Sequence, residues 1–176
     1  MSRKLADWCD SPDSRTQSLG LGQYLFHRDD PVEAMFVVVA GDVSLSRVQV
    51  DGGLIVLQRA GSGDILAESS LFSDRYHCDA VAETAMRVRR IPRNRLRDRF
   101  RTEPDFAEAW AEHLTRETQK SRFRSEVLSR RTVASRLDGW LAWHDVLPPK
   151  GDWKRVAHEL GVTAEALYRE IARRRG

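Results

Sequence analysis

The sequence has few cysteines and no long apolar run, and these absences exclude several classes of protein. Cys9 and Cys78 are its two cysteines, too few for a four-thiolate zinc or iron–sulfur site, and the five histidines form no close-spaced metal motif with them. No apolar stretch approaches the roughly 20 residues that span a bilayer, and Met1–Leu5 are followed by Asp7, Trp8 and Asp10 where a secretory signal would have an apolar stretch. We therefore expect no membrane anchor, a cytoplasmic location and reduced thiols.

Motifs that organise catalysis are also missing. The sequence contains no Gly-rich phosphate loop, no nucleophile elbow and no paired carboxylates at a catalytic spacing. We expect a binding protein that is not an enzyme.

Composition favours a folded chain with an uneven charge distribution. The chain has 176 residues, of which 41% are apolar and 31% are charged, and this length and apolar content are enough to bury a core. Residues 1–105 hold 15 Lys and Arg against 16 Asp and Glu, whereas residues 106–176 hold 14 against 10. The second part is therefore the candidate for binding a polyanion.

The region from Leu19 to Pro92 is typical of antiparallel β-structure. Short β-forming runs alternate with turns, the sharpest being Asp51-Gly52-Gly53, where glycine accepts the positive φ of a tight hairpin. We expect an α+β protein in which a loose arm, residues 1–18, precedes a β-sandwich or barrel, residues 19–103. The expected strands are Gln23–Phe26, Ala34–Val39, Val43–Val50, Leu54–Arg59, Ile65–Leu66, Ala80–Ala82 and Met86–Ile91.

Helical periodicity replaces the β pattern after Pro92. Residues 104–131 predict a long connecting helix, with no Gly or Pro after Pro104 to end it. Its seam begins with Phe106 and Trp110 and is polar in the middle. Two interpretations stay open: the seam packs against a second copy in a homodimer, or these two aromatic residues only cover the β domain.

Residues 132–176 predict three short helices. The first runs from Thr132 to about His144, and Asp152 is a good N-cap for the second. Gly161 separates the second from the third, with Leu167 and Ile171 expected inside. The last two helices have the pattern of a helix-turn-helix, in which Ala157 is small at the crossing and Val162 fills the turn.

The first turn of the last helix is the candidate DNA-reading surface. Glutamate can accept from a cytosine amino group, arginine can contact guanine with two hydrogen bonds, and the terminal arginines can neutralise phosphates. The alternative is an ordinary helical hairpin with a solvated basic end. The residues predicted to contact double-stranded DNA are Thr163, Ala164, Glu165, Tyr168, Arg169 and Arg173.

Three segments resemble the CRP/FNR superfamily of bacterial transcription regulators. Gly22–Pro31 and Ala34–Val43 are similar to the opening of that family's cyclic-nucleotide-binding β-roll, and Gly63–Phe72 is similar to its phosphate-binding cassette. The resemblance extends from about Leu19 to Arg175. It implies an antiparallel double-stranded β-helix that senses an effector, a dimerisation helix, and a DNA-binding domain joined through a hinge near Arg131–Ser135.

The resemblance also implies an effector pocket in the β-roll. Glu68 matches the family's ribose-binding glutamate, but Ala67 replaces the preceding glycine, and Tyr76-His77 stands where the phosphate-binding Arg-Ser pair would be. Without that arginine, burial of a phosphate costs several kcal/mol more, so cyclic nucleotide binding is disfavoured. The predicted pocket residues are Glu68, Ser69, Arg75, Tyr76, His77 and Ser121, with a small-molecule effector whose identity stays open.

Haem is disfavoured too, because the adjacent His77 and Cys78 point to opposite faces of a strand. A buried Cys78 and a His77 at the pocket rim are the alternative, and no cofactor is expected.

Two further expectations concern arginines and missing elements. Eight arginines between Arg87 and Arg101 predict a solvated face with ion pairs, an anionic partner being the alternative. Neither the family's β-hairpin before the helix-turn-helix nor its wing has an evident counterpart, so residues 132–176 predict a bare three-helix unit. The competing function is a ligand- or protein-binding β-roll whose degenerate helix-turn-helix does not bind DNA.

Overall fold

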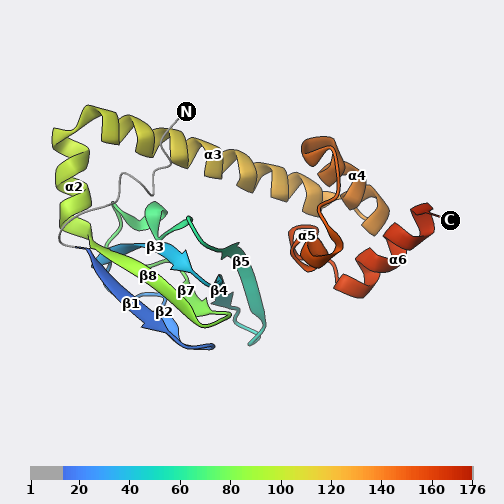
Figure 1. Ribbon diagram of the computed structural model, residues 1–176, viewed down its shortest axis with the longest axis horizontal. Coiled ribbons are helices and arrows are strands. Elements are labelled where there is room, and N and C mark those ends of the chain that lie inside the picture. The colour runs from blue at the N-terminus through green and yellow to red at the C-terminus, as the bar shows by residue number, and fades with distance from the viewer. Residues whose placement is uncertain (1–13, 176) are drawn as a thin grey trace. The chain divides into compact units, whose positions relative to one another are not determined.

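The computed structural model describes residues 14–175, and its contacts divide the chain into two compact units, Met1–Leu114 and Thr115–Gly176. Most of the arm predicted over residues 1–18 lies outside the described residues. The boundary between the units falls within one long helix (Figure 1).

The first unit is built on two four-stranded antiparallel sheets, with strand orders β1-β8-β3-β6 and β2-β7-β4-β5. Apart from the β4–β5 hairpin, consecutive strands alternate between the two sheets, which makes the fold a β-roll, as predicted. The strands are β1 (Arg15–Leu19), β2 (Tyr24–Phe26), β3 (Ala34–Ala40), β4 (Val43–Val48), β5 (Leu54–Ala60), β6 (Ile65–Leu66), β7 (Asp79–Ala82) and β8 (Met86–Pro92).

Strand β1 is the one strand absent from the prediction. It pairs with β8 from Arg15↔Arg90 to Leu19↔Met86, and four of its five residues are exposed. Its sequence RTQSL has no apolar alternation, because only Leu19 points into the core. Pairing with β8, and not a buried face, therefore holds this edge strand in place.

Two helices follow β8 and close one side of the roll. They are α2 (Arg93–Thr102) and α3 (Pro104–Ser129). Leu96, Phe106 and Trp110 are almost fully buried and belong to the same apolar cluster as β3. Phe106 and Trp110 thus cover the β domain, and packing of the rest of the α3 seam against a second copy stays a prediction.

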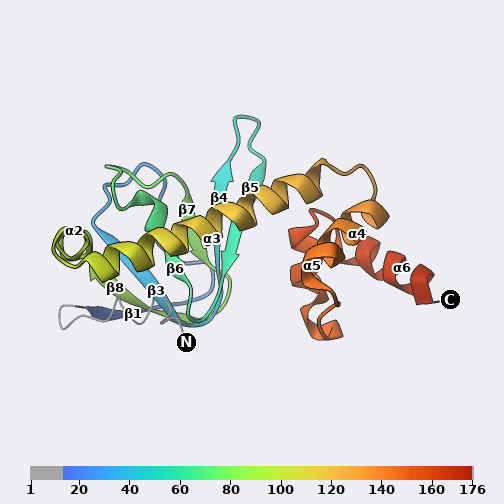
Figure 2. The same cartoon turned by 90° about the horizontal axis from the view of Figure 1, so that it is seen from above.

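Glycine shapes two of the turns in the first unit. Gly52, at φ 82°, lies in the hairpin between β4 and β5, which projects beyond the neighbouring strands in Figure 2. Gly41 joins β3 to β4 at φ 87°, and a Cβ there would lie 2.6 Å from the carbonyl oxygen of Ala85. Only glycine fits that position, because both the dihedral angle and the space exclude a side chain.

The arginines of β8 and α2 form ion pairs at the surface, as predicted. Arg90 pairs with Glu33 at 2.9 Å and Arg99 with Glu103 at 2.7 Å, while the guanidinium of Arg97 lies 5.7 Å from the centre of the Phe72 ring. Arg93 and Arg101 also lie near Asp74 and Asp98, at 3.9 and 3.6 Å, so at least four of the eight arginines in this run have a carboxylate partner.

The second unit is helical. It comprises the end of α3 followed by α4 (Val133–His144), α5 (Trp153–Glu159) and α6 (Ala164–Arg175), with 3₁₀ turn η2 (Lys150–Asp152) before α5. Its apolar core consists of Val127, Leu137, Trp140, Trp153, Val156, Ala157, Leu160, Leu167 and Ile171. Between residues 115 and 175, all of them described, there is no β-strand, in agreement with the predicted three-helix unit.

The first residues of α4 and α5 differ in how they are capped. Thr132 caps α4 through a reciprocal capping box with Ser135, whose backbone N–H donates to Thr132 Oγ1 at 3.0 Å. The prediction that Asp152 caps α5 is wrong. Asp152 has helical dihedral angles and no side-chain capping bond, because η2 already turns the chain into α5.

No helix within residues 14–175 is both long and apolar enough to cross a membrane.

Candidate functional sites

The helix-turn-helix predicted in the second unit is formed by α5, a short turn and α6. Ala157 is buried where the helices approach, and the backbone N–H of Val162 donates to the carbonyl of Ala157 at 3.0 Å. Gly161 turns the chain at φ 62°, and Val162 packs against the apolar core. These residues fix the angle between the two helices.

The first turns of α6 present polar side chains to solvent. Thr163, Glu165 and Arg169 are exposed, whereas Ala164 and Tyr168 are half-buried. Thr163 Oγ1 accepts a hydrogen bond from the backbone N–H of Ala166 at 3.2 Å and so caps the helix. Buried Leu167 and Ile171 anchor the opposite face of α6. Five of the six predicted DNA contacts therefore lie together on the first turns of one anchored helix.

Glu165 is held in its ionised form. Its own backbone N–H and the Thr163 hydroxyl donate to the carboxylate, and Arg169 and Lys154 add positive charge, so the pKa of Glu165 is lowered. The surface thus offers an acceptor and a guanidinium about one turn apart on the helix, a pair that can contact cytosine and guanine edges.

Arg173, the sixth predicted contact, is already paired. Its Nε and Nη2 donate to Glu170 at 3.0 and 2.7 Å, and Arg174 donates to the same carboxylate at 2.7 Å. Arg174 also contacts Asp138 at 2.8 Å and so ties α6 to α4. A phosphate contact by Arg173 would have to compete with this bidentate pair.

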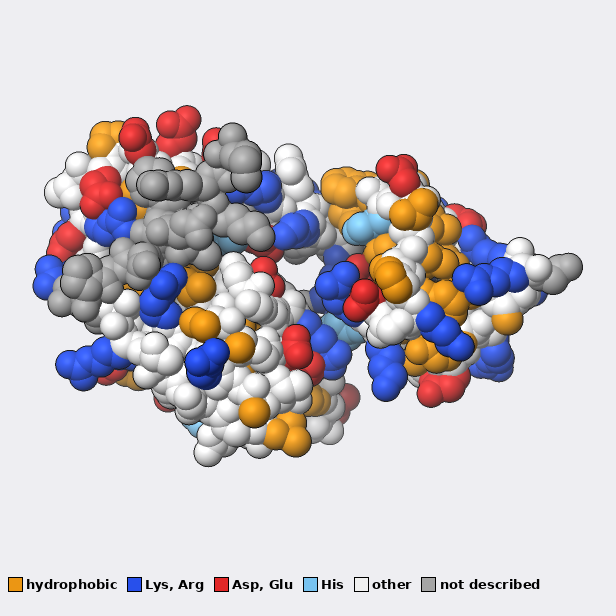
Figure 3. All heavy atoms as spheres, in the orientation of Figure 1, with side chains coloured by type: hydrophobic (Ala, Val, Ile, Leu, Met, Phe, Trp, Pro, Cys, Tyr) orange, Lys and Arg blue, Asp and Glu red, His pale blue; other side chains and the backbone are white. Residues whose placement is uncertain are grey.

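The second unit is strongly basic. Its 14 Lys and Arg residues outnumber its eight Asp and Glu residues, for a net charge of +6, while the first unit has 15 and 18, for a net charge of −3. Figure 3 shows Lys and Arg side chains spread over the visible face of the second unit. This is the charge distribution expected for a unit that meets a polyanion.

The β-roll holds the second candidate site, a cavity of about 40 Å³ beside 3₁₀ turn η1 (Glu68–Ser70). Ala67, just before η1, adopts left-handed dihedral angles (φ 64°, ψ 16°) that glycine ordinarily supplies. The cavity is lined by Phe26, Leu45, Gln58, Ala67, Glu68, Ser69, Ser70, His77 and Cys78.

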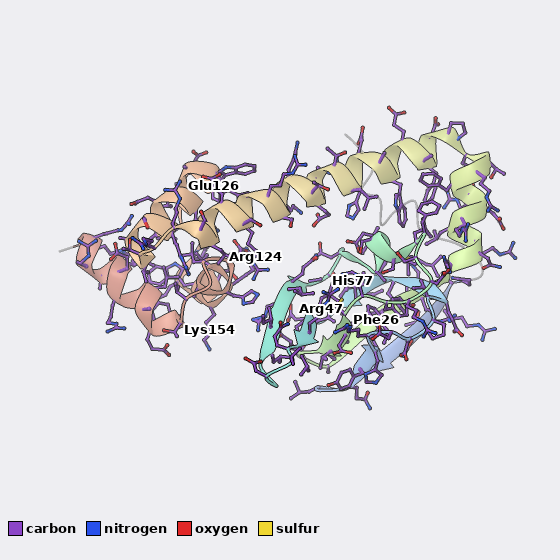
Figure 4. The ribbon with its side chains drawn as sticks, turned by 180° about the vertical axis from the view of Figure 1, so that it is seen from behind. Phe26, Arg47, His77, Arg124, Glu126 and Lys154 are labelled. Carbon is purple, nitrogen blue, oxygen red and sulfur yellow. The ribbon has the colours of Figure 1, made fainter. Side chains whose placement is uncertain are left out.

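His77 and Cys78 are uncharged at neutral pH. Burial and the nearby guanidinium of Arg47 lower the pKa of His77, and burial raises the pKa of the Cys78 thiol to about 11. Arg47 Nε donates to the backbone carbonyl of His77 at 2.6 Å, and Figure 4 shows Arg47, His77 and Phe26 close together in the roll. A buried Cys78 and a rim-located His77 are what the sequence analysis favoured over haem ligation.

Three of the six predicted pocket residues line the cavity: Glu68, Ser69 and His77. Tyr76 instead points into the core, where its hydroxyl donates to the carbonyl of Ala34 at 2.7 Å and its ring stacks on Phe26. Arg75 donates to the backbone carbonyl of Asp29.

Ser121 is exposed on the part of α3 that belongs to the second unit, so its place in the pocket stays a prediction.

Sequence reasoning missed the apolar wall of the cavity and Arg47. Phe26 and Leu45 are inward positions of the strand alternation, so the pattern could have identified them. Nothing in the sequence around Arg47 distinguishes it from the other surface arginines, because its neighbour His77 is 30 residues away.

Cyclic nucleotide binding, which the sequence disfavours, stays a prediction, and the lining of the cavity bears on it. None of its nine lining residues is Lys or Arg, and the imidazole of His77 is neutral. A buried phosphodiester anion requires a cation, so this cavity gives its phosphate no compensating charge. Among residues 14–175 there is also no cluster of three His, Cys, Asp or Glu that could hold a metal ion.

Comparison with protein families identifies the first unit. The family model of the cyclic nucleotide-binding domain matches residues 16–103, half of the chain. The chain belongs to the cyclic nucleotide-binding domain family.

Relatives of this cyclic nucleotide-binding domain protein confirm the resemblance to CRP/FNR regulators. A "Global nitrogen regulator" of Synechococcus elongatus is 27% identical over 124 residues, which are 68% of this chain and 55% of that protein. The chain thus spans about half the length of this relative. The relative's name describes a regulator and not an enzyme.

Solved structures share the fold at low sequence identity. The structure of FixK2 from Bradyrhizobium japonicum superimposes with a TM-score of 0.73 at 18% identity, covering 91% of this chain and 83% of that one. The c-di-GMP-responsive global regulator CLP of Xanthomonas campestris gives a TM-score of 0.65 at 21% identity, covering 92% and 86%.

Proposed function

We propose that this chain is a sequence-specific DNA-binding transcription regulator of the CRP/FNR type. The observation that carries the proposal is the exposed start of α6, where Thr163, Glu165 and Arg169 face solvent on a helix anchored by Leu167. An ordinary helical hairpin has no need of this arrangement, and the net charge of +6 on the second unit supplies the attraction to phosphates. Because no β-strand lies between residues 115 and 175, α6 is proposed to make most of the base contacts of this unit.

The β-roll is proposed to receive the controlling signal. The cavity beside η1 combines the Glu68 carboxylate, the neutral polar side chains of Gln58, Ser69, Ser70 and His77, and an apolar wall, which favours a small ligand without a phosphate group. A homodimer is proposed as the acting form, because two recognition helices about 34 Å apart would read a palindromic operator.

Selection from a random duplex library, followed by an electrophoretic mobility assay with the selected duplex, tests the proposal. Enrichment of one sequence, bound at least tenfold more tightly than its scrambled form, supports a regulator. Equal affinity for all duplexes at every salt concentration would reject sequence-specific binding and favour a β-roll binding module whose helix-turn-helix only packs.

Arg169→Ala is the matched test of base contact. If Arg169 reads a base, the variant loses roughly 1–3 kcal/mol of specific binding. Arg155→Ala, which removes an exposed arginine from α5, is the control and should weaken binding to all duplexes alike.

A further inference from the structure

Arg136, in the first turn of α4, makes an unusual set of contacts in the second unit. Its Nε donates to the backbone carbonyl of Arg130 at 2.8 Å, and its Nη2 to that of Leu128 at 3.2 Å. Its Nη1 donates to the carbonyls of Leu160 at 3.0 Å and Gly161 at 3.1 Å. One guanidinium therefore serves four backbone acceptors, and no carboxylate of the described residues pairs with it.

The acceptors belong to two helix ends. Leu128 and Arg130 lie at the end of α3, and Leu160 and Gly161 follow the end of α5. The last carbonyls of a helix have no partner within it and carry the negative end of the helix dipole. A guanidinium placed between two such ends satisfies both, and the two dipoles take the place of a carboxylate partner.

A second contact fastens the same two helix ends. A Cβ on Gly161 would lie 2.5 Å from Leu128 Cδ2 and 3.4 Å from Arg136 Nη1. The turn of the helix-turn-helix therefore lies directly against the last turn of α3. Val127, the neighbour of Leu128, is buried in the core that α4, α5 and α6 form.

We infer that Arg136 is a positioning residue that locks the helix-turn-helix onto the end of α3. The inference rests on the proposed DNA-binding function. The lock spans residues 131–135, which the sequence analysis proposed as a hinge, so this linker does not move freely. The end of α3 and the DNA-reading helix then move as one body, and a signal arriving along α3 reorients α6 directly.

Arg136→Lys tests the lock in the full chain. Lysine keeps the positive charge, but its single ammonium group lacks the planar fork that reaches two helix ends. Arg131→Lys, the same change at an exposed arginine five residues away, is the matched control. Leu128→Ala removes the apolar half of the contact and provides a second variant if Arg136→Lys lowers the overall melting temperature.

Hydrogen exchange in the absence of DNA measures how tightly the turn between α5 and α6 is held against the end of α3. We expect Arg136→Lys and Leu128→Ala to speed exchange of the Gly161 and Val162 amides about tenfold, while amides in the middle of α6 and the Arg131→Lys control keep their rates. Unchanged exchange at Gly161 and Val162 in both variants would overturn the inference.

Binding to DNA measures what the lock does. For Arg136→Lys we expect about tenfold weaker binding to a duplex selected by the wild-type protein, with unchanged affinity for poly(dI-dC) and an unchanged salt dependence. An equal loss for both DNAs would show that Arg136 acts through charge or overall folding, and would overturn the positioning role. If the wild-type protein selects no duplex, the proposed function fails, and the exchange rates alone decide whether the lock exists.

Discussion

At the scale of single residues, backbone geometry decides where this sequence cannot change. Gly41 and Gly22 both have positive φ, at 87° and 77°, but only Gly41 meets the chain closely, with Ala85 and Met86 atoms 2.6 Å from the position of a Cβ. The two glycines therefore separate the cost of dihedral strain from the cost of a steric clash.

We predict that Gly41→Ala destabilises the first unit by about 3 kcal/mol or more, because strain and overpacking add. Gly22→Ala, where nothing lies within 4 Å, should cost only about 1 kcal/mol. Urea-induced unfolding of both variants measures the difference. Equal losses would show that the close approach at Gly41 does not constrain the fold.

Glu170 makes the stability of the second unit depend on pH. Hydrogen bonds from Arg173 and Arg174 lower the pKa of this carboxyl group to about 2, from an ordinary value of 4.5. A carboxylate with a lowered pKa stabilises the folded state above its unfolded pKa, and this stabilisation is lost as the pH falls toward the folded value.

The stability difference between the wild-type protein and Glu170→Gln should therefore be largest above about pH 5 and shrink as the pH falls from about 5 to about 2. Thermal melting across this range is the measurement. A difference that stays constant with pH would mean that the ion pairs with Arg173 and Arg174 do not form.

At the scale of elements, the sequence predicts well wherever a local rule has no competitor. The helix predicted from Thr132 to about His144 forms as α4, and the hairpin at Asp51-Gly52-Gly53 forms. Asp152 is a good N-cap by sequence, yet the 3₁₀ turn before α5 leaves its side chain without a capping role. Strand β1 was invisible because its stability comes from pairing with β8, 67 or more residues away in the chain.

The capping box at Thr132 carries a measurable share of the stability of α4. Thr132→Ala removes the acceptor of the Ser135 N–H and should cost about 1 kcal/mol. Thr132→Ser keeps the hydroxyl and should cost much less. Chemical denaturation compares the two, and equal losses would show that the methyl group of Thr132, not its hydroxyl, supports the helix.

Of the two candidate sites, one could be predicted from the sequence and the other could not. The exposed face of α6 follows from helical period alone, so Glu165 and Arg169 could be placed from the sequence. The cavity in the β-roll could not, because it depends on how two sheets face one another. Tyr76 was assigned to the pocket by alignment, but its hydroxyl reaches the Ala34 carbonyl in the core.

At the scale of the whole molecule, the two units have opposite net charges and different proposed functions. The acidic β-roll has a cavity with no cation, whereas the basic helical unit exposes an ionised Glu165 beside Arg169. In this account an effector acts at the β-roll, and α6 recognises DNA.

The most direct test of this account is the ratio of the affinities for a selected duplex and for its scrambled form. Fluorescence anisotropy measures this ratio over a range of salt concentrations, for the wild-type protein and for Arg169→Ala. The account predicts a ratio of at least ten for the wild-type protein at every salt concentration and a ratio near one for Arg169→Ala, with similar salt slopes for the scrambled duplex. A wild-type ratio of one, or a ratio that Arg169→Ala leaves intact, would contradict it.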